Sequence, residues 1–191
     1  RTDGTMWTWG SGTTGRQGQN NTTQYKSPRQ LGSETTWGFV VSGSGGAIAT
    51  KTDGTLWAWG ANTEGQLAQN DRTQRSSPIQ IPGTDWDYSA YDKIAMGSQA
   101  GYGIKTDGTL WGWGPGTDGQ FGNNTSGPTA KRSSPIQITG MEGVTSVFYE
   151  GASVAAVGDA KLWVWGTNQQ GIFGQNGAYN IGNYKWSSPV Q

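Results

Sequence analysis

The stretch TDGTLWAWG, residues 52–60, decides the fold because it recurs along the chain. Related stretches are TDGTMWTWG at 2–10, TDGTLWGWG at 106–114 and GDAKLWVWG at 158–166. Self-similarity at a fixed period of this length is typical of a protein built from stacked structural repeats. The Trp-x-Trp-Gly elements are separated by 50, 54 and 52 residues, since they start at Trp7, Trp57, Trp111 and Trp163.

Two further elements keep the same phase. A glycine-rich hexapeptide follows each Trp-x-Trp, and a Ser-Pro pair follows each hexapeptide. The hexapeptides are GRQGQN from Gly15, GQLAQN from Gly65, GQFGNN from Gly119 and GIFGQN from Gly171. The Ser-Pro segments begin at Ser27, Ser76, Ser133 and Ser187. Three elements in one fixed order predict repeat units at 2–51, 52–105, 106–157 and 158–191.

Short alternating segments predict β-strands within each unit. Asp-Gly pairs at Asp53 and Asp107 separate such segments and predict hairpins in which both turn residues have positive φ. Four antiparallel strands in about 50 residues correspond to one blade of a β-propeller. The fold class predicted is therefore all-β. The expected strands, in the order in which one unit is read, are PIQI at 78–81, KIAMGS at 93–98, AGYGIKT at 100–106 and TLWGWG at 109–114.

The paired tryptophans are either sugar-stacking platforms or core residues between blades. Burying one indole removes about 200 Å² from water, worth roughly 5 kcal/mol as an upper bound, so eight contribute on the order of 40 kcal/mol. A domain is stable by only about 5 to 15 kcal/mol. Leaving all eight exposed would forfeit more than that margin, which favours the core. The predicted blade-core residues are Trp7, Trp9, Trp57, Trp59, Trp111, Trp113, Trp163 and Trp165.

Composition excludes several classes of function. The 13 Lys and Arg residues balance 13 Asp and Glu residues, which argues against binding to nucleic acid. The chain has no Cys and no His, so it lacks thiolate metal ligands and the usual general base. We therefore expect no enzyme activity, no metal and no cofactor. No apolar run approaches the roughly 18 residues of a membrane span.

Three segments resemble the repeat of the regulator of chromosome condensation family: KTDG at 51–54, GTLWAWGANTEGQL at 54–67 and SPIQI at 77–81. The resemblance extends over essentially the entire chain. It implies a seven-bladed β-propeller with four strands in each blade, used mainly as a protein-binding scaffold.

The chain departs from the family pattern at one point. Family repeats usually carry Gly-x-x-His before the hairpin, where this chain has Gly46, Ala100 and Ala152. The missing His puts the guanine-nucleotide exchange activity of the founding member in doubt.

The number of repeats limits how much of a ring this chain can form. Seven units of this length need roughly 365 residues. The 191 residues supply about 3.7 blades, so we expect a partial β-propeller over residues 1–191 that is part of a longer chain.

Partner-binding residues are expected where one repeat departs from the others. Segments 84–93 and 175–186 carry extra aromatic residues, which dominate binding hot spots when they lie on loops. The alternative is that these aromatics merely cap a blade edge. Because the two segments join different strands, they are expected on two separate surfaces. The candidates are Trp86, Tyr88, Tyr91, Tyr179, Tyr184 and Trp186.

Two groups of charged side chains could form a binding site or could simply be solvated. Carboxylates at Asp85, Asp87 and Asp92 are interpreted as a solvated loop, since they lack the spacing of a calcium site. A basic residue precedes each Ser-Pro, and these residues either line one rim for an acidic partner or are solvated. They are Lys26, Arg75, Arg132 and Lys185.

The function predicted is a non-enzymatic structural and protein-interaction module. Thr-Asp-Gly-Thr-Leu-Trp with long uncharged polar connections resembles the versions of this repeat that bacteria and their phages encode. The resemblance implies a phage virion or appendage component, or an extracellular bacterial surface protein. Its partners would be other virion subunits or further copies of itself. One alternative is a carbohydrate-binding propeller in which Trp86 and Trp186 stack on a glycan. The third is nucleotide exchange on a small GTPase.

Overall fold

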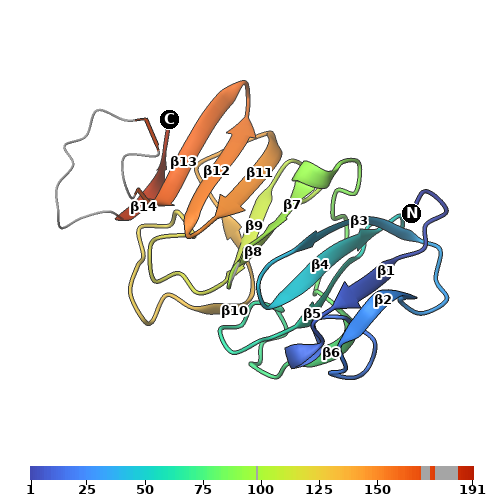
Figure 1. The fold of residues 1–191 in the computed structure, drawn as a ribbon. Helices are drawn as coiled ribbons and strands as arrows, with labels where there is room; N and C mark the ends of the chain where they lie inside the picture. The colour runs from blue at the N-terminus through green and yellow to red at the C-terminus, as the bar shows by residue number, and fades with distance from the viewer. Residues whose placement is uncertain (98, 169–172, 175–184) are drawn as a thin grey trace.

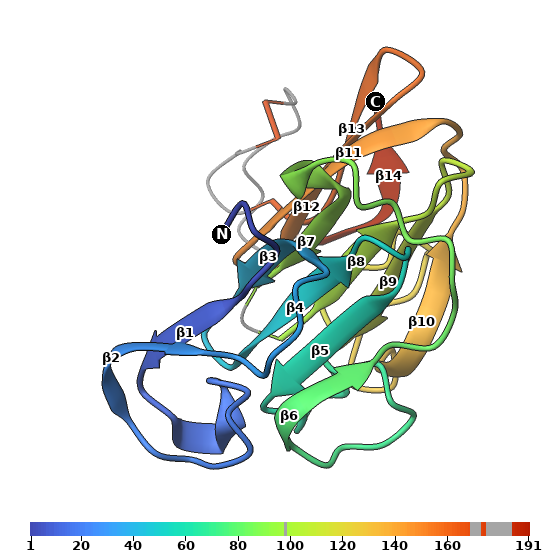
Figure 2. The same ribbon diagram turned by 90° about the vertical axis from the view of Figure 1, so that its right-hand side faces the viewer.

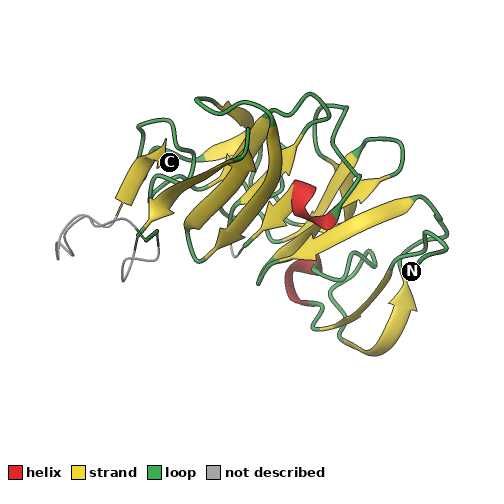
Figure 3. Ribbon diagram, turned by 90° about the horizontal axis from the view of Figure 1, so that it is seen from above, coloured by secondary structure: helices red, strands yellow, loops and turns green. Residues whose placement is uncertain are grey.

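The computed structural model describes residues 1–97, 99–168, 173–174 and 185–191 (Figure 1). These residues form antiparallel sheets that stand in a row, with the N-terminal sheet at one end and the C-terminal sheet at the other (Figures 1 and 3). The sheets comprise one two-stranded and three four-stranded sheets in the part that the structure describes. The all-β fold of a partial β-propeller is confirmed.

The strands follow one another in each sheet in chain order. The two-stranded sheet holds β1 (Trp7–Gly10) and β2 (Tyr25–Gln30). The second holds β3 (Trp37–Ser42), β4 (Gly46–Lys51), β5 (Leu56–Gly60) and β6 (Arg75–Gln80). The third holds β7 (Ile94–Met96), β8 (Gly101–Ile104), β9 (Leu110–Gly114) and β10 (Arg132–Ile138). The fourth holds β11 (Val144–Glu150), β12 (Ser153–Gly158), β13 (Lys161–Thr167) and β14 (Lys185–Val190). Two short 3-10 helices are η1 (Thr13–Gly15) and η2 (Tyr91–Lys93). None of the described helical segments has the length and apolarity needed to cross a bilayer.

The Ser-Pro strand ends a sheet, whereas the sequence reading placed it first in the unit. β6 pairs with the preceding Trp-x-Trp strand β5, with Ala58 opposite Ile79. The glycine-rich loop between them returns the chain to the open edge of β5. A sequence period such as 52–105 therefore contains the last two strands of one sheet and the first two of the next.

First strands of neighbouring sheets lie in contact, β3 with β7 and β7 with β11. Apolar side chains from facing sheets fill the space between them. One cluster joins Ile48 and Leu56 of the second sheet to Ile94 and Trp113 of the third. The core thus lies between sheets, as in a row of propeller blades.

The hairpin between the second and third strands fastens each sheet to the next one. The carbonyl oxygen of its glycine accepts a hydrogen bond from a backbone N–H that starts the following first strand in β3 and β11, and that lies ahead of β7 in the third sheet. The bonds are Trp37 N to Gly4 O (3.2 Å), Trp86 N to Gly54 O (3.0 Å) and Val144 N to Gly108 O (2.9 Å).

A second set of bonds fastens the opposite ends of the sheets. In the second, third and fourth sheets, the second Trp of the motif donates its indole N–H to the glycine-rich loop of the preceding sheet. A backbone N–H of the same loop donates to the Ser-Pro strand of the following sheet. The indole bonds are Trp59 to Arg16 O (3.0 Å), Trp113 to Gln66 O (2.9 Å) and Trp165 to Gln120 O (2.7 Å). The backbone bonds are Asn20 to Ser76 O (2.7 Å), Asn70 to Ser133 O (2.6 Å) and Asn124 to Ser187 O (2.7 Å).

The Asp-Gly turns differ from the type predicted, because the glycine alone has positive φ. Gly54 has φ 78°, and its N–H donates to Lys51 O at 3.1 Å. The Asp53 carboxylate instead accepts bonds from Thr55 N (2.9 Å) and Thr55 Oγ1 (2.6 Å). In the last repeat, Asp159 and Ala160 both have positive φ, 49° and 58°, although neither is glycine.

The two tryptophans of each motif are buried to different degrees. The second one is fully buried in three repeats, as Trp59, Trp113 and Trp165. The first is half-buried. Trp9 contradicts the prediction of a core position, because 58% of its surface is exposed. The physical reason is that β1 has a strand on one side only in the described residues.

Candidate interaction groove

The inserted segment 84–93 supplies both a core residue and an exposed one. Trp86 was expected to bind a partner, but it is 1% exposed and packs edge-on against Trp113 with ring centroids 6.0 Å apart. Its backbone bridges to Lys105 just as Trp37 pairs with Lys51, so it occupies the equivalent position in the next sheet. That correspondence with Trp37 was the sequence signal for a core residue.

Tyr88 and Tyr91 lie on the surface, as expected of residues that meet a partner. Tyr91 is 67% exposed and begins η2. The helix is anchored to the next sheet, because Asp92 Oδ2 accepts a hydrogen bond from Ser146 Oγ at 2.6 Å. Lys93 Nζ donates to the Thr145 carbonyl oxygen. Tyr91 is therefore held beside β11.

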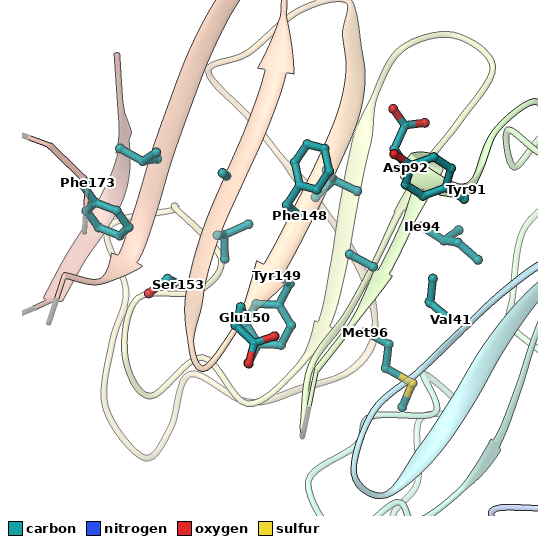
Figure 4. Close-up of a pocket in the computed structure, with 15 residues that line it drawn as sticks. Val41, Tyr91, Asp92, Ile94, Met96, Phe148, Tyr149, Glu150, Ser153 and Phe173 are labelled. Carbon is teal, nitrogen blue, oxygen red and sulfur yellow. The ribbon is translucent and has the colours of Figure 1, made fainter.

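A groove of about 510 Å³ runs from η2 across the first strands (Figure 4). Val41 comes from β3, Ile94 and Met96 come from β7, and Val147 and Phe148 come from β11. Tyr91 and Asp92 lie at one end of the groove and Phe173 lies at the other (Figure 4). We call this feature the inner groove. Sequence analysis missed it because its apolar strand residues look like ordinary core positions.

The charge of the inner groove is negative. Among the described residues that line it, Asp92 and Glu150 are charged and no Lys or Arg is present. Asp92 Oδ1 is buried and has no hydrogen-bond partner among the described residues. The groove therefore offers apolar surface, the exposed rings of Tyr91 and Phe148, and the exposed carboxylate of Glu150.

Two tyrosines beside the groove are kept neutral by burial. Tyr102 packs against Tyr149 with ring centroids 5.1 Å apart, and its hydroxyl donates to Gln120 O at 2.8 Å. Burial raises the pKa of Tyr102 well above its ordinary value of 10.0. Burial, with a smaller contribution from the Asp118 charge, raises the pKa of Tyr149 to about 12.

Part of the groove lies on the outer face of the last described sheet. Phe148 pairs with Ala155, which pairs with Val164. The equivalent row in the second sheet is Val41, Ile48 and Ala58, which the third sheet covers. Phe148 is consequently exposed. Tyr91 and Asp92 lie where the third and fourth sheets meet.

Of the second predicted segment, 175–186, the structure describes residues 185 and 186. Trp186 is partly buried against Phe173, with ring centroids 5.6 Å apart. Tyr179 and Tyr184 lie outside the described residues, so the expectation of two separate surfaces stays a prediction.

The predicted rim charges are mostly engaged with neighbouring groups. Arg75 pairs with Asp71 at 2.6 Å, and Lys185 pairs with Asp118 of the preceding sheet at 2.7 Å. Arg132 donates to the Lys131 carbonyl at 2.9 Å, while Lys26 is exposed. The described side chains therefore do not form a continuous basic rim.

No group of three or more His, Cys, Asp or Glu residues suited to a metal ion occurs within the described part of the chain. The carboxylates of segment 84–93 instead make local contacts. Asp87 lies 3.8 Å from Lys93, and Asp85 Oδ2 accepts a bond from Thr84 Oγ1 at 3.0 Å.

Comparison with protein families finds the regulator of chromosome condensation (RCC1) repeat at residues 53–98 and 107–157. A second description of the same repeat matches residues 39–66. A search of curated protein sequences finds no match.

Solved structures share the fold at low sequence identity. Prp20p from Saccharomyces cerevisiae superposes with a TM-score of 0.78 and 19% identity, over 96% of this chain and 45% of that one. Yeast RCC1 (Prp20), solved with Kap60 bound to it, gives 0.77 and 20%, over 98% and 44%. Human WBSCR16 gives 0.77 and 16%, over 96% and 46%. The chain thus spans less than half the length of these proteins.

Proposed function

Because the chain belongs to the regulator of chromosome condensation repeat family, we propose that it is a non-enzymatic scaffold that holds a protein partner in the inner groove. One observation carries the proposal. An exposed aromatic residue, Tyr91, is anchored beside an apolar groove whose charged residues are both acidic. Exposed aromatics next to a concave apolar surface are typical of binding hot spots.

The chemistry of the groove selects a class of partner. Apolar walls favour an aliphatic or aromatic side chain, and carboxylates favour a cation beside it. We therefore expect a segment in which a Lys or Arg residue lies next to an apolar residue. A cation over the ring of Tyr91 would add a further attraction of about 0.5 to 1 kcal/mol at an exposed site.

Two of the similar structures concern proteins that bind other proteins. One has Kap60 bound to yeast RCC1, and the other concerns binding of Prp20p to Gsp1p and histones. Those partners are properties of the yeast protein. They support a protein-binding role for this chain as a class of function.

Within that class we place the protein in a phage virion or appendage, or on the extracellular surface of a bacterium. Balanced charge and the absence of Cys and His support this assignment, as do long uncharged polar connections. Stoichiometric co-purification with particles or filaments is expected. Recovery solely as a free cytosolic monomer would contradict it.

The groove is tested by selecting a displayed random peptide library on the immobilised chain. We expect the selected peptides to carry Lys or Arg next to an apolar residue. Their affinity should fall about tenfold or more for Tyr91→Ala and for Asp92→Asn. The matched control is Leu162→Ala, since Leu162 is also exposed and lies outside the groove. Peptides that bind both groove variants with unchanged affinity would refute the proposal.

A polar hollow favours glycan binding as a second candidate. It measures about 790 Å³ and is lined by Asp107, Gln137, Glu142 and Trp163. A half-buried indole with polar neighbours suits a sugar face. Glycan-array binding that Trp163→Ala abolishes, in a variant that keeps its circular dichroism spectrum, would support this function over the first.

Nucleotide exchange on a GTPase is the disfavoured alternative. A release assay with labelled nucleotide tests it directly, and accelerated release would overturn the non-enzymatic assignment.

A further inference from the structure

A relay of hydrogen bonds recurs beside the Trp-x-Trp strand in the first three repeats. The first Trp donates its indole N–H to the hydroxyl of the Thr two residues earlier, and that hydroxyl donates to the Asp of the hairpin. The indole bonds are Trp7 to Thr5 (3.0 Å), Trp57 to Thr55 (2.8 Å) and Trp111 to Thr109 (2.9 Å). The hydroxyl bonds are Thr5 to Asp3 (2.6 Å), Thr55 to Asp53 (2.6 Å) and Thr109 to Asp107 (2.7 Å). We call this arrangement the Trp–Thr–Asp relay.

The fourth repeat keeps both ends of the relay and lacks its middle. Trp163 and Asp159 are retained, but Lys161 stands where the other repeats have Thr. Within the described part of the chain, the Trp163 indole N–H and the Asp159 carboxylate make no hydrogen bond or ion pair. Trp163 Nε1 is not one of the buried atoms without a partner, so this N–H is open to solvent. A donor and an acceptor are therefore both left free.

The same repeat lacks the large side chains that cover the first Trp elsewhere. In the second sheet, Trp37 stands opposite Lys51, and its ring lies 6.3 Å from the ring of Trp57. Lys51 Nζ lies 3.9 Å from the centroid of the Trp57 ring. In the fourth sheet this place is held by Val144 opposite Gly158. Two small residues thus replace an indole and an ammonium, which leaves space beside the first Trp of that repeat.

The space beside Trp163 is the polar hollow of about 790 Å³. Its size is within the range of about 300 to 1,000 Å³ that is typical of small-molecule sites. Its walls come from the hairpin at 107–109, the connection at 139–143 and the hairpin that carries Asp159 and Lys161. These segments lie at one end of the third and fourth sheets (Figure 2). Both ends of the broken relay therefore face one hollow.

The chemistry of the two free groups defines what can complete the relay. An indole N–H only donates a hydrogen bond, and a carboxylate only accepts one. A hydroxyl does both, and it is the group that Thr supplies in the other repeats. A ligand with several hydroxyls also finds hydrogen-bond partners in Gln137, Thr139 and Glu142, which line the same hollow.

We infer that the polar hollow binds a neutral sugar, one hydroxyl of which takes the place of the missing Thr hydroxyl between Trp163 and Asp159. The inference rests on glycan binding, the second candidate function proposed above, and names the group that the site recognises. Charge selects neutral over acidic sugars, because three carboxylates among the described lining residues face one ammonium, that of Lys161. The carboxylates are those of Asp107, Glu142 and Asp159.

The probe is a glycan array that is incubated with the labelled chain. The array carries neutral glycans that end in glucose, galactose, mannose or N-acetylglucosamine, and acidic glycans that end in sialic or glucuronic acid. We expect binding to neutral glycans only. Titration calorimetry then measures the Kd of the neutral glycan that binds best, for the parent chain and for each variant.

Two variants test the role of the hydroxyl. Trp163→Phe keeps a ring and removes the N–H, so the affinity should fall about fivefold or more. Lys161→Thr places a protein hydroxyl two residues before Trp163, as in the other repeats, and this hydroxyl occupies the place of the ligand's. Its affinity should be about tenfold or more below that of the matched control Lys161→Ala, which removes the same ammonium without adding a hydroxyl. Leu162→Ala should leave the affinity unchanged, since Leu162 is exposed and does not line the hollow.

Circular dichroism spectra that match the parent establish that each variant is folded. Equal affinities for Lys161→Thr and Lys161→Ala, or unchanged binding by Trp163→Phe, would overturn the inference. Glycan binding that only Trp163→Ala abolishes would then still support the second candidate function. A preference for acidic glycans would also overturn the inference, and a lack of binding to every neutral glycan would overturn both. The scaffold function of the inner groove is unaffected by these outcomes, because the peptide selection tests it separately.

Discussion

Replacing Trp113 with Ala should destabilise the protein strongly, whereas the same change at Trp9 should have little effect. The two residues hold equivalent places in the repeat. Trp113 is fully buried, donates its indole N–H to Gln66 O at 2.9 Å and packs edge-on against Trp86. Trp9 is exposed over more than half of its surface.

The expected magnitude follows from these contacts. Truncating a buried Trp to Ala costs about 3 to 5 kcal/mol, because the lost transfer free energy adds to that of the cavity. Leaving the Gln66 carbonyl without its donor contributes about 1 kcal/mol of that total. Trp9→Ala should cost less than about 1 kcal/mol, since surface substitutions usually change stability little. Trp113→Phe keeps a ring in the site and should fall between the two.

The assay is equilibrium unfolding in urea, followed by far-ultraviolet circular dichroism so that the loss of a fluorophore does not alter the signal. The free energy of unfolding is compared at a common slope. Equal midpoints for Trp113→Ala and Trp9→Ala would refute the reasoning. The two indoles would then contribute alike, and inter-sheet burial would not be the source of stability.

Three further predictions concern turns and titrating groups. Ala160→Gly should raise the free energy of unfolding by roughly 0.5 to 1 kcal/mol in a urea titration, because Ala160 is exposed and has φ 58°. The hydrogen bond from the Thr55 side chain is the main cause that lowers the pKa of Asp53 below 3.8, so the stability that this carboxylate contributes is present above that pH and is lost as pH falls through the lowered pKa. Thr55→Val should therefore flatten the acid limb of a plot of stability against pH. Burial raises the pKa of Tyr102 and Tyr149, so their contribution is complete below pH 10.0 and is lost as pH rises through their folded pKa values, about 12 for Tyr149. Absorbance at 295 nm should show that these phenols ionise as the protein unfolds, and Tyr149→Phe should reduce the alkaline loss.

Sequence predicted the fold because the repeated residues are the ones that touch neighbouring sheets. The Trp-x-Trp, glycine-rich and Ser-Pro elements recur in fixed order since each bonds to an element of a neighbouring repeat. The position of the sheet boundaries within the repeat could not be predicted in the same way. A period of 52–105 is equally consistent with a Ser-Pro strand that opens a sheet and with one that closes it, and only the pairing of Ala58 with Ile79 decides between them.

The partner-binding residues were predicted less well than the fold, because contacts between sheets also decide which residues of segment 84–93 are buried. Segment 84–93 was identified by its extra length, and Tyr91 is indeed exposed within it. The segment nevertheless contains Trp86, whose place in the core depends on its distance from the hairpin and not on its position in an insertion. Loop length indicates where a chain is free to vary, whereas burial depends on which neighbour the backbone reaches.

The bonds between sheets also explain how a repeat of this kind can carry a specific site. Hairpin glycines, second tryptophans and Ser-Pro strands hold the sheets together through both of their ends. First strands take part in these bonds through backbone N–H groups, as at Trp37 and Val144, while their side chains contribute apolar contacts. Equivalent positions on them accordingly differ, as Val41 in β3, Ala95 in β7 and Phe148 in β11 show. Variation along the first strands changes the inner groove while the fastening between sheets stays the same, so a new partner can be accommodated without a new fold.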